Sequence, residues 1–314
     1  MSRPEQSWSS RVGTRSVLFL ALSMVSLLAI SQKAASPGFD GDRALADVEK
    51  LVAFGPRPSG SEAHRRAQEF LLEQLAATGL EVERDDFTAR TPVGPIAMSN
   101  LIAERRGTSE KKILVAGHYD TKRFDDFSFV GANDGGSSAA VVLELARALV
   151  RLDPPLATTV WLVLLDGEEA VVDWSDTDSL YGSRHLASRM ETTGEIGQVG
   201  AFLLVDMVGD RELGIVREMR STPWLQDLVW AEAQRLGHGE YFLESRMYID
   251  DDHLPFARRG VPVVDLIDFQ YGPVNTFWHS REDTLDKLSA ASLRAVGETL
   301  LSVLVQLDGR LNKQ

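Results

Sequence analysis

The sequence contains no cysteine among its 314 residues. Disulfide bonds, thiolate nucleophiles and cysteine-ligated zinc are therefore excluded. Positive charge is also scarce, because 33 lysines and arginines stand against 46 acidic residues and give a formal net charge of −13. This balance argues against nucleic acid as a partner, since a nucleic-acid-binding protein needs a basic face. Any metal site must use histidine and carboxylate side chains, so the six histidines are informative.

The N-terminus has a basic stretch followed by a short hydrophobic run. Arg11 and Arg15 precede the run at residues 17–30, which is shorter than the ~20 residues of a membrane-spanning helix. The pattern predicts that residues 1–35 are a signal peptide, cleaved after Ser31, that exports the protein to the periplasm or the medium. An uncleaved membrane anchor formed by residues 17–30 is the alternative.

Hydrophobic runs alternate with helical patterns in the rest of the chain. Continuous apolar runs are typical of buried strands, and they occur within residues 111–120, 158–169, 199–209 and 260–268. Periodic apolar positions predict helices over residues 42–55, 61–79, 136–152, 222–237 and 288–307, and residues 81–88 and 98–104 alternate like a hairpin. We expect one α/β domain over residues 36–314, with an open, mixed, mostly parallel central sheet and helices on both faces.

Acidic residues and histidines follow the predicted strands. Because functional side chains gather beyond the carboxyl ends of parallel strands, these residues are expected close together. Any one of these acids, taken alone, is more often a solvated residue or a helix cap, as Asp134 could be. Their recurrence after each buried strand favours a first-row metal, and zinc suits such a mixed ligand set. The residues are His118, Asp120, Asp134, Asp166, Glu168, Glu169, Asp206 and His279.

Six short motifs occur in an order that resembles a known group of enzymes. They are HYD, GANDGG, DGEE, VDMVG, DDHLPF followed by GVP, and FWHS followed by DT. Together they are similar to the zinc aminopeptidase clan and its relatives, the glutaminyl-peptide cyclotransferases, over nearly all of residues 40–310. The segment 166–187 with Trp174, the acid Asp251 and the tryptophan Trp278 before His279 resemble the cyclotransferase branch.

The resemblance implies an activity and a role for each matching residue. The activity is conversion of the N-terminal glutamine of peptides or proteins to pyroglutamate with release of ammonia, assisted by one zinc ion. The implied zinc ligands are Asp134, Glu169 and His279, the acid and base is Glu168 with Asp206 and Asp251 as acidic partners, and Trp174 and Trp278 form the walls of the substrate pocket. Extended neighbours face opposite ways, so Glu168 and Glu169 can divide these roles only if the chain turns there.

Two other functions stay open at this point. In a two-zinc aminopeptidase, His118 and Asp206 would bind a second ion with Asp134 as the bridge, and VDMVG resembles that branch more closely. A non-catalytic ectodomain would have lost a ligand or the base, and this chain keeps them all. We further expect a monomer, a role for His253 in orienting an acid, and an entrance to the site that is shaped by Tyr119 and residues 122–124.

Overall fold

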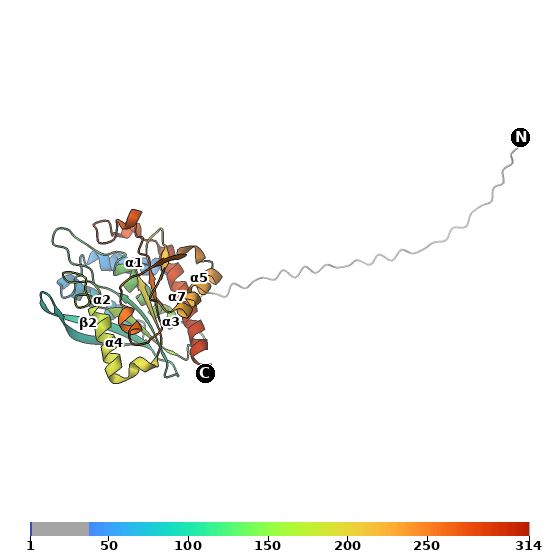
Figure 1. Ribbon diagram of the computed structural model, residues 1–314, viewed down its shortest axis with the longest axis horizontal. Helices are drawn as coiled ribbons and strands as arrows, with labels where there is room; N and C mark the ends of the chain where they lie inside the picture. Colours follow the sequence, from blue (N-terminus) through green and yellow to red (C-terminus); the bar gives the residue numbers. More distant parts are fainter. Residues whose placement is uncertain (2–37, 314) are drawn as a thin grey trace. The chain divides into compact units, whose positions relative to one another are not determined.

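A mixed six-stranded sheet forms the centre of the protein, and helices cover both of its faces (Figure 1). The computed structural model describes Met1 and residues 38–313, and residues 38–313 lie within one compact unit. The expected signal peptide or anchor falls on residues that are not described apart from Met1, so the boundary at residue 35 stays a prediction.

The central sheet has the strand order β1-β2-β4-β3-β5-β8. The neighbours β4, β3, β5 and β8 run parallel, whereas β2 pairs antiparallel with both β1 and β4. This topology confirms the predicted open, mostly parallel mixed sheet. The strands are β1 (Glu81–Thr91), β2 (Gly94–Arg105), β3 (Lys112–His118), β4 (Thr159–Leu165), β5 (Val199–Asp206) and β8 (Val263–Ile267).

Alternate side chains of the buried strands enter two different cores. In β3, Ile113 and Val115 pack with one set of helices, and Leu114 and Ala116 pack with the other. A continuous apolar run is expected of a strand that is covered on both faces. The first face carries α1 (Gly41–Ala53), α2 (Glu62–Ala76), α3 (Gly136–Leu149), α5 (Pro223–Leu236) and α7 (Ala290–Leu311), and the second carries α4 (Tyr181–Thr193) and α6 (Leu254–Ala257).

A second, two-stranded sheet was not predicted. It pairs β6 (Ile215–Glu218) with β7 (Phe242–Met247) in parallel. Residues 243–246 of β7 are all exposed, so this strand lacks the hydrophobic alternation by which a half-buried strand is detected. The hairpin of β1 and β2 is also longer than predicted. The strands continue to Thr91 and begin again at Gly94, beyond the alternating residues from which the hairpin was predicted.

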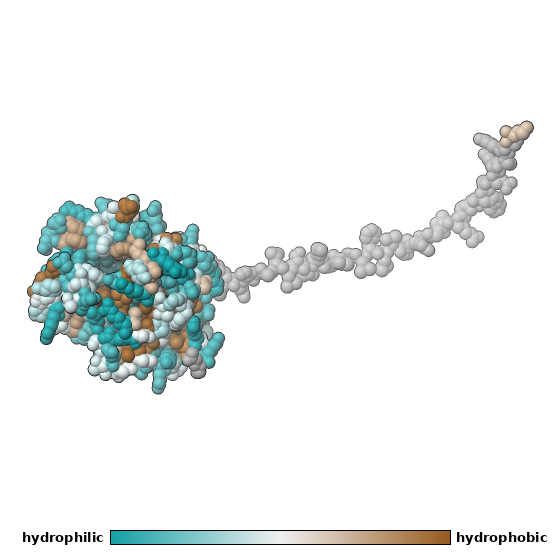
Figure 2. All heavy atoms as spheres, viewed as in Figure 1, coloured by the Kyte–Doolittle hydropathy of each residue, from teal (hydrophilic) through white to brown (hydrophobic). Residues whose placement is uncertain are grey.

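Within the described residues, α7 is the helix with the length and hydropathy of a candidate membrane span. It packs against α1, α3 and α5, and 61% of its most apolar window is buried. Its hydrophobic side chains therefore belong to the core of the first face. Figure 2 shows one face of the protein, where hydrophilic residues predominate and hydrophobic ones form small groups.

A buried carboxylate at the end of β4 joins three parts of the fold. Asp166 Oδ1 accepts hydrogen bonds from Ser59 Oγ at 2.7 Å and from His64 Nε2 at 2.8 Å. Its Oδ2 accepts from the Ser99 backbone N–H at 2.7 Å and from Gln68 Nε2 at 3.2 Å. Asp166, expected among the acids of the functional site, instead holds the start of α2 and strand β2 against β4.

The pair of Asp166 and His64 predicts a pH-dependent stability. Burial lowers the pKa of His64, but the Asp166 carboxylate outweighs it and raises this pKa above its ordinary value. A raised folded-state pKa contributes stability that is fully present below the unfolded pKa of about 6.5 and is lost as the pH rises through the folded pKa. We expect His64→Gln to lower the free energy of unfolding by about 1–3 kcal/mol at low pH. Urea unfolding at several pH values should show this difference shrink as pH increases; a difference that grows with pH would contradict the assignment.

Candidate metal centre and active-site pocket

Side chains from five segments converge beyond the carboxyl ends of the parallel strands. They follow β3, β4 and β5, precede α3, and lie in the loop after β8. The structure thus brings together, at one edge of the sheet, residues that are up to 161 positions apart, from His118 to His279. The converging residues are His118, Asp134, Glu168, Glu169, Asp206 and His279.

Asp134 lies between two histidines. The N-cap of α3 is Gly135, whose φ is 80°, and a Cβ at this position would collide with the Asp120 carbonyl oxygen. The glycine therefore allows the loop to approach β3 closely. Asp134 Oδ1 is 3.3 Å from His118 Nε2, and its Oδ2 is 3.3 Å from His279 Nε2. The carboxylate is thus turned toward the two imidazoles, and the possible role of Asp134 as a helix cap is not adopted.

One group of donors comprises the three predicted zinc ligands. His279 Nε2 is 3.0 Å from Glu169 Oε1, and one donor atom each from Asp134, Glu169 and His279 lie within 4.8 Å of one another. Glu169 Oε2 is buried without a hydrogen-bond partner among the described residues, and Lys122 Nζ is 3.9 Å from it. One imidazole and two carboxylates at this spacing fit a zinc ion that keeps a position open for substrate.

A second group of donors shares Asp134 with the first. His118 Nε2 is 3.0 Å from Asp206 Oδ1, and donor atoms of His118, Asp134 and Asp206 also lie within 4.8 Å of one another. Ser138 Oγ donates to the same Asp206 oxygen at 3.2 Å. The residues expected for a second metal ion are therefore assembled as well, with Asp134 in the bridging position.

The electrostatics of both groups favour positive charge. Burial lowers the pKa of His279, but Glu169 and Asp134 outweigh it and raise this pKa to about 10. Burial also lowers the pKa of His118, but the Asp206 carboxylate and further acids outweigh it and raise this pKa well above its ordinary value. Although burial acts in the other direction, hydrogen bonds from both histidines hold the pKa of Asp134 below its usual range. A cation at this point would be strongly stabilised.

His279 has a backbone conformation that is uncommon for a side chain with a Cβ. Its φ is 50°, in the left-handed region that favours glycine. The imidazole stacks on Trp278 with ring centroids 4.1 Å apart, and Phe124 and Phe129 contact it edge-on at 5.8 and 5.7 Å. Such strain persists where the surroundings determine the position fully, and it is common at functional sites.

A pocket of about 230 Å³ opens beside the metal ligands. Its walls include both predicted tryptophans, of which Trp174 is 42% exposed and Trp278 37% exposed. The other lining residues comprise acids and apolar side chains: Asp134, Glu168, Glu169, Asp206, Tyr248, Ile249, Asp250, Asp251, Ile267, Phe269 and His279. An apolar pocket with a few convergent polar groups is the usual form of a small-ligand site. Hydrophobicity alone could not identify Tyr248, Ile249 and Phe269 as pocket residues, because it equally indicates core packing.

The chain turns between β4 and the two adjacent glutamates. Gly167 has a φ of 70°, and the Asp120 carboxylate accepts hydrogen bonds from the N–H groups of Glu168 and Glu169 at 3.1 and 3.4 Å. Burial raises the pKa of Glu168 well above its ordinary value. His118 acts to lower this pKa, and neighbouring carboxylates act to raise it further. The turn places Glu169 with Asp134 and His279 and leaves Glu168 facing the pocket.

Further acids lie behind the pocket. Burial, and then the Asp265 and Asp206 carboxylates, raise the pKa of Asp251 well above its ordinary value. His253 is fully buried, with Nε2 3.3 Å from Glu218 Oε2 and Nδ1 3.7 Å from Asp265 Oδ2. Asp251 itself lines the pocket, and His253 lies among the acids behind it.

The fold and this geometry agree with comparisons to known proteins. Residues 100–304 match the model of peptidase family M28. The chain belongs to peptidase family M28.

Glutaminyl-peptide cyclotransferases are among its relatives in this family. The chain is 35% identical over 286 residues to a glutaminyl-peptide cyclotransferase-like protein of Bos taurus, which covers 82% of this chain and 73% of that protein. The glutaminyl cyclase of an Acidobacteriales bacterium superposes with a TM-score of 0.83 at 42% identity, over 87% of this chain and 96% of that one. A Zn-dependent exopeptidase of Parabacteroides distasonis superposes with a TM-score of 0.78 at 27% identity, over 86% and 99%. The resemblance found from the six motifs is confirmed.

Two residues of this M28 chain support the ligands and were not singled out from the sequence. Asp283 accepts hydrogen bonds from the N–H groups of Asn133 and Asp134 at 2.7 and 3.1 Å. Arg57, fully buried, donates to the carbonyl oxygens of Val130 and Gly131 at 2.6 and 3.0 Å. The DT motif contains Asp283 and could have indicated it, whereas a lone arginine in a Pro- and Gly-rich loop gives no such signal.

Tyr119 does not lie at the entrance of the site. Its side chain is fully buried, and its hydroxyl donates to the Ser99 carbonyl oxygen at 2.7 Å and accepts from Gln68 Nε2 at 2.7 Å. The reason is the alternation of strand side chains, which sends His118 and Tyr119 in opposite directions at the end of β3. The expectation for Tyr119 was therefore wrong.

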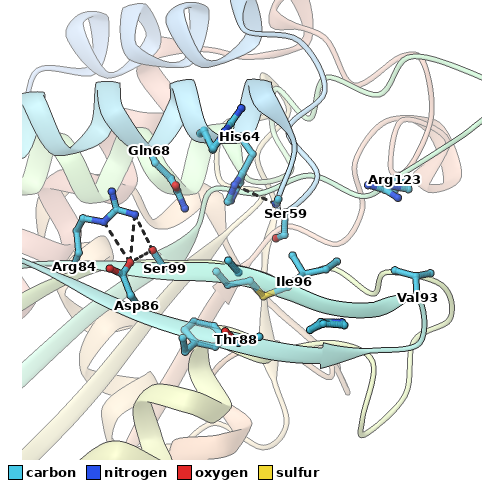
Figure 3. Close-up of a pocket in the computed structure, with 16 residues that line it drawn as sticks. Ser59, His64, Gln68, Arg84, Asp86, Thr88, Val93, Ile96, Ser99 and Arg123 are labelled. Carbon is cyan, nitrogen blue, oxygen red and sulfur yellow. Dashed lines mark hydrogen bonds and ion pairs between the residues drawn. The ribbon is translucent and has the colours of Figure 1, made fainter.

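A larger cavity, of about 770 Å³, lies between α2 and the hairpin of β1 and β2 (Figure 3). Ser59, His64 and Gln68 approach it from the helix side, and their polar groups are bonded to Asp166. On the hairpin, Arg84 and Asp86 form an ion pair at 3.3 Å. The smaller pocket is the better candidate for chemistry, because the metal-binding groups and buried acids face it.

The two donor groups predict a particular zinc content. Zinc held by Asp134, Glu169 and His279 should amount to about one ion per chain after dialysis, as in a catalytic site with three protein ligands. His279→Ala should remove it, and His118→Ala should leave it in place. Metal analysis of the purified proteins checks this. Two ions in the wild type, with one lost in His118→Ala, would show instead that the second group is also occupied.

Asp283 predicts a supporting contribution to metal affinity. Asp283→Asn replaces an acceptor oxygen by a donor amide beside the N–H groups of residues 133 and 134, and should weaken zinc binding by about 10- to 100-fold, as is typical for groups that orient a ligand. Competition with a chromophoric chelator measures the change. Asp286→Asn, at an exposed position nearby in the same loop, is the control and should bind zinc as the wild type does.

Proposed function

We propose that this protein is a zinc-dependent glutaminyl-peptide cyclotransferase, which converts the N-terminal glutamine of peptides to pyroglutamate and releases ammonia. The observation that carries the proposal is the pocket in which Glu168, two tryptophans and the ligand group face one space. The names of the relatives support the same activity.

Asp134, Glu169 and His279 would hold the zinc ion. When bound, zinc supplies a Lewis acid for the carbonyl oxygen of the glutamine side-chain amide. The remaining chemistry falls to residues of the pocket.

Glu168 is assigned the proton transfers. The reaction forms a bond from the substrate's α-nitrogen to its own side-chain amide carbon and breaks the bond from that carbon to the amide nitrogen. Glu168 accepts the proton that the α-amine loses and donates it to the departing nitrogen, which leaves as ammonia. Because the nucleophile belongs to the substrate, neither a second reactant nor a bound water is required.

Asp206 and Asp251 are assigned to the partners of this transfer. Both carboxyl groups line the pocket with Glu168, and the crowding of buried acids favours a proton shared among them. The carboxylate oxygens of Asp206 and Asp251 would accept hydrogen bonds from the substrate's amino group while its proton moves to Glu168.

Trp174 and Trp278 are assigned to substrate binding. Cyclisation requires the glutamine side chain to fold back on its own amine. A pocket of about 230 Å³ would leave little room for extended conformations of that glutamine. Holding the reacting atoms near contact distance is a large part of the rate advantage of an intramolecular reaction. Ile249 and Phe269, which line the same space, would exclude water with the tryptophans.

The aminopeptidase alternative has weaker support. His118, Asp134 and Asp206 are placed as a second metal ion would need, and one similar solved structure is described as a leucine aminopeptidase precursor from Bacteroides thetaiotaomicron, at 27% identity. The relatives of higher identity are cyclotransferases by name, so hydrolysis of N-terminal residues is not favoured.

The proposed role of Glu168 predicts a large loss of activity. Glu168→Gln keeps the shape of the side chain but removes its ability to carry the proton, so kcat should fall by about 10²- to 10⁴-fold. Ammonia release from a Gln-initiated peptide, with mass spectrometry of the product, measures it. The variant should keep its zinc content, which shows that the site is intact, and Glu240→Gln on the surface is the matched control.

The same assay distinguishes the two activities. The wild type should form a pyroglutamyl product from the Gln-initiated peptide and release no free leucine from a Leu-initiated one, and a chelator should abolish the reaction. Free leucine without cyclisation would refute the proposal in favour of the aminopeptidase.

Export and a monomeric state complete the proposal. The basic stretch and hydrophobic run before residue 31 support secretion to the periplasm or the medium, either with cleavage or with residues 17–30 kept as an anchor. N-terminal sequencing of the mature protein and light scattering test the two statements.

A further inference from the structure

Two hollows adjoin the mouth of the active-site pocket. Their volumes are about 270 and 430 Å³. The first hollow shares Trp174 and Asp250 with the pocket, and the two hollows share Asp176, Asp250, Leu254 and Arg258 with each other. The three spaces therefore form one groove that leads away from the candidate catalytic residues past α6.

Three arginines line this groove on a chain of net charge −13. They come from three separate elements: Arg184 from α4, Arg220 from the turn after β6, and Arg258 from the end of α6. The acids in the same walls are Asp176 and Asp250. Among the residues that line the two hollows, the three arginines therefore outnumber the two aspartates.

Two of the three arginines form exposed ion pairs, in which a ligand could replace the aspartate. Arg258 Nη2 is 3.7 Å from Asp176 Oδ1, with the side chains 61% and 91% exposed. Arg220 pairs with Asp250, with the side chains 42% and 54% exposed. Exposed ion pairs are weak, so a carboxylate of an incoming ligand can replace either aspartate at little cost.

Arg184 provides the surplus charge. Its guanidinium donates to the carbonyl oxygens of Leu180 and Asp176 at 3.2 and 2.6 Å, and within the described residues no carboxylate oxygen lies within 4.0 Å of it. The backbone contacts hold the group in place but do not neutralise it. Arg184 therefore keeps a positive charge in the first hollow that is not bonded to a carboxylate.

We propose that this groove binds residues 2–4 of the substrate peptide and favours acidic side chains there. The inference rests on the proposed function, because the groove begins where the chain of a glutamine bound in the pocket would continue. An extended chain advances about 3.3 Å per residue, so residues 2–4 would span about 10 Å of the hollows that adjoin the pocket. The substrate class is peptides in which N-terminal glutamine is followed by aspartate or glutamate.

The test compares three substrates by kcat/KM. These are a Gln-Glu-Glu peptide amide, a Gln-Lys-Lys peptide amide and glutamine amide, which has no residue that reaches the groove and serves as the internal reference for each variant. The wild type should prefer the Glu peptide to the Lys peptide by about three- to tenfold at low salt, mostly through KM. The ratio should fall as salt is added, since exposed charges are screened beyond ~8 Å at physiological ionic strength.

Variants assign the preference to the groove. Arg258→Gln, which leaves two arginines against two aspartates, should bring the ratio close to one, and Arg220→Gln combined with Arg258→Gln should turn it toward the Lys peptide. Arg106→Gln is the matched control, because it too removes an exposed, ion-paired arginine. Arg106 follows Arg105, the last residue of β2, which pairs with Val160 near the start of β4 and thus away from the strand ends that carry the site. The control variant should keep the wild-type ratio.

The outcomes separate the groove from the proposed activity. If wild-type protein fails to cyclise even glutamine amide, the proposed function is wrong. If glutamine amide is cyclised but the wild type shows no preference for the Glu peptide, or if the arginine variants keep the wild-type ratio, the groove proposal is overturned.

Discussion

The position of Asp134 between His118 and His279 is the contact on which the site depends. Its two oxygens face two imidazoles at 3.3 Å each, and each imidazole also contacts a carboxylate from another strand end. Buried carboxylates repel one another and lose hydration, so such a cluster is stable only around positive charge. The donor groups therefore have to be preorganised, and much of the surrounding structure serves that purpose.

Preorganisation comes from charged side chains that form hydrogen bonds with the backbone of the loops that carry the candidate ligands. Asp283 and Asp120 accept N–H groups of the two ligand loops, and Arg57 donates to carbonyl oxygens of the loop before Asp134. Glycines allow the turns at residues 135 and 167. Asp166 contributes at a distance, because it holds α2 and β2 against the strand that carries Glu168 and Glu169.

The protein separates its proposed chemistry from its proposed recognition by depth. The acids and ligands are buried, where interactions between charges are strong and water is limited. The arginines of the adjoining groove are exposed, where interactions are weak and exchangeable. A buried site suits one reaction on one type of residue. An exposed groove can bind many different peptides, with modest differences in affinity between them.

The sequence by itself determined the mixed sheet, most helices and the identity of the ligand candidates, because hydrophobic periodicity and ordered motifs are local signals. The position of an acid after a strand could not by itself distinguish Asp134 and Glu169, which face the site, from Asp166, which turns to His64 and Ser59; only the motif resemblance did so. All three are acids after or near a buried strand, and each side chain has at least one partner more than 100 residues away in the chain. The support from Arg57 and Asp283, the burial of Tyr119 and the charged groove beside Trp174 were likewise decided only by tertiary structure, since contacts between distant segments leave no periodic pattern in the chain.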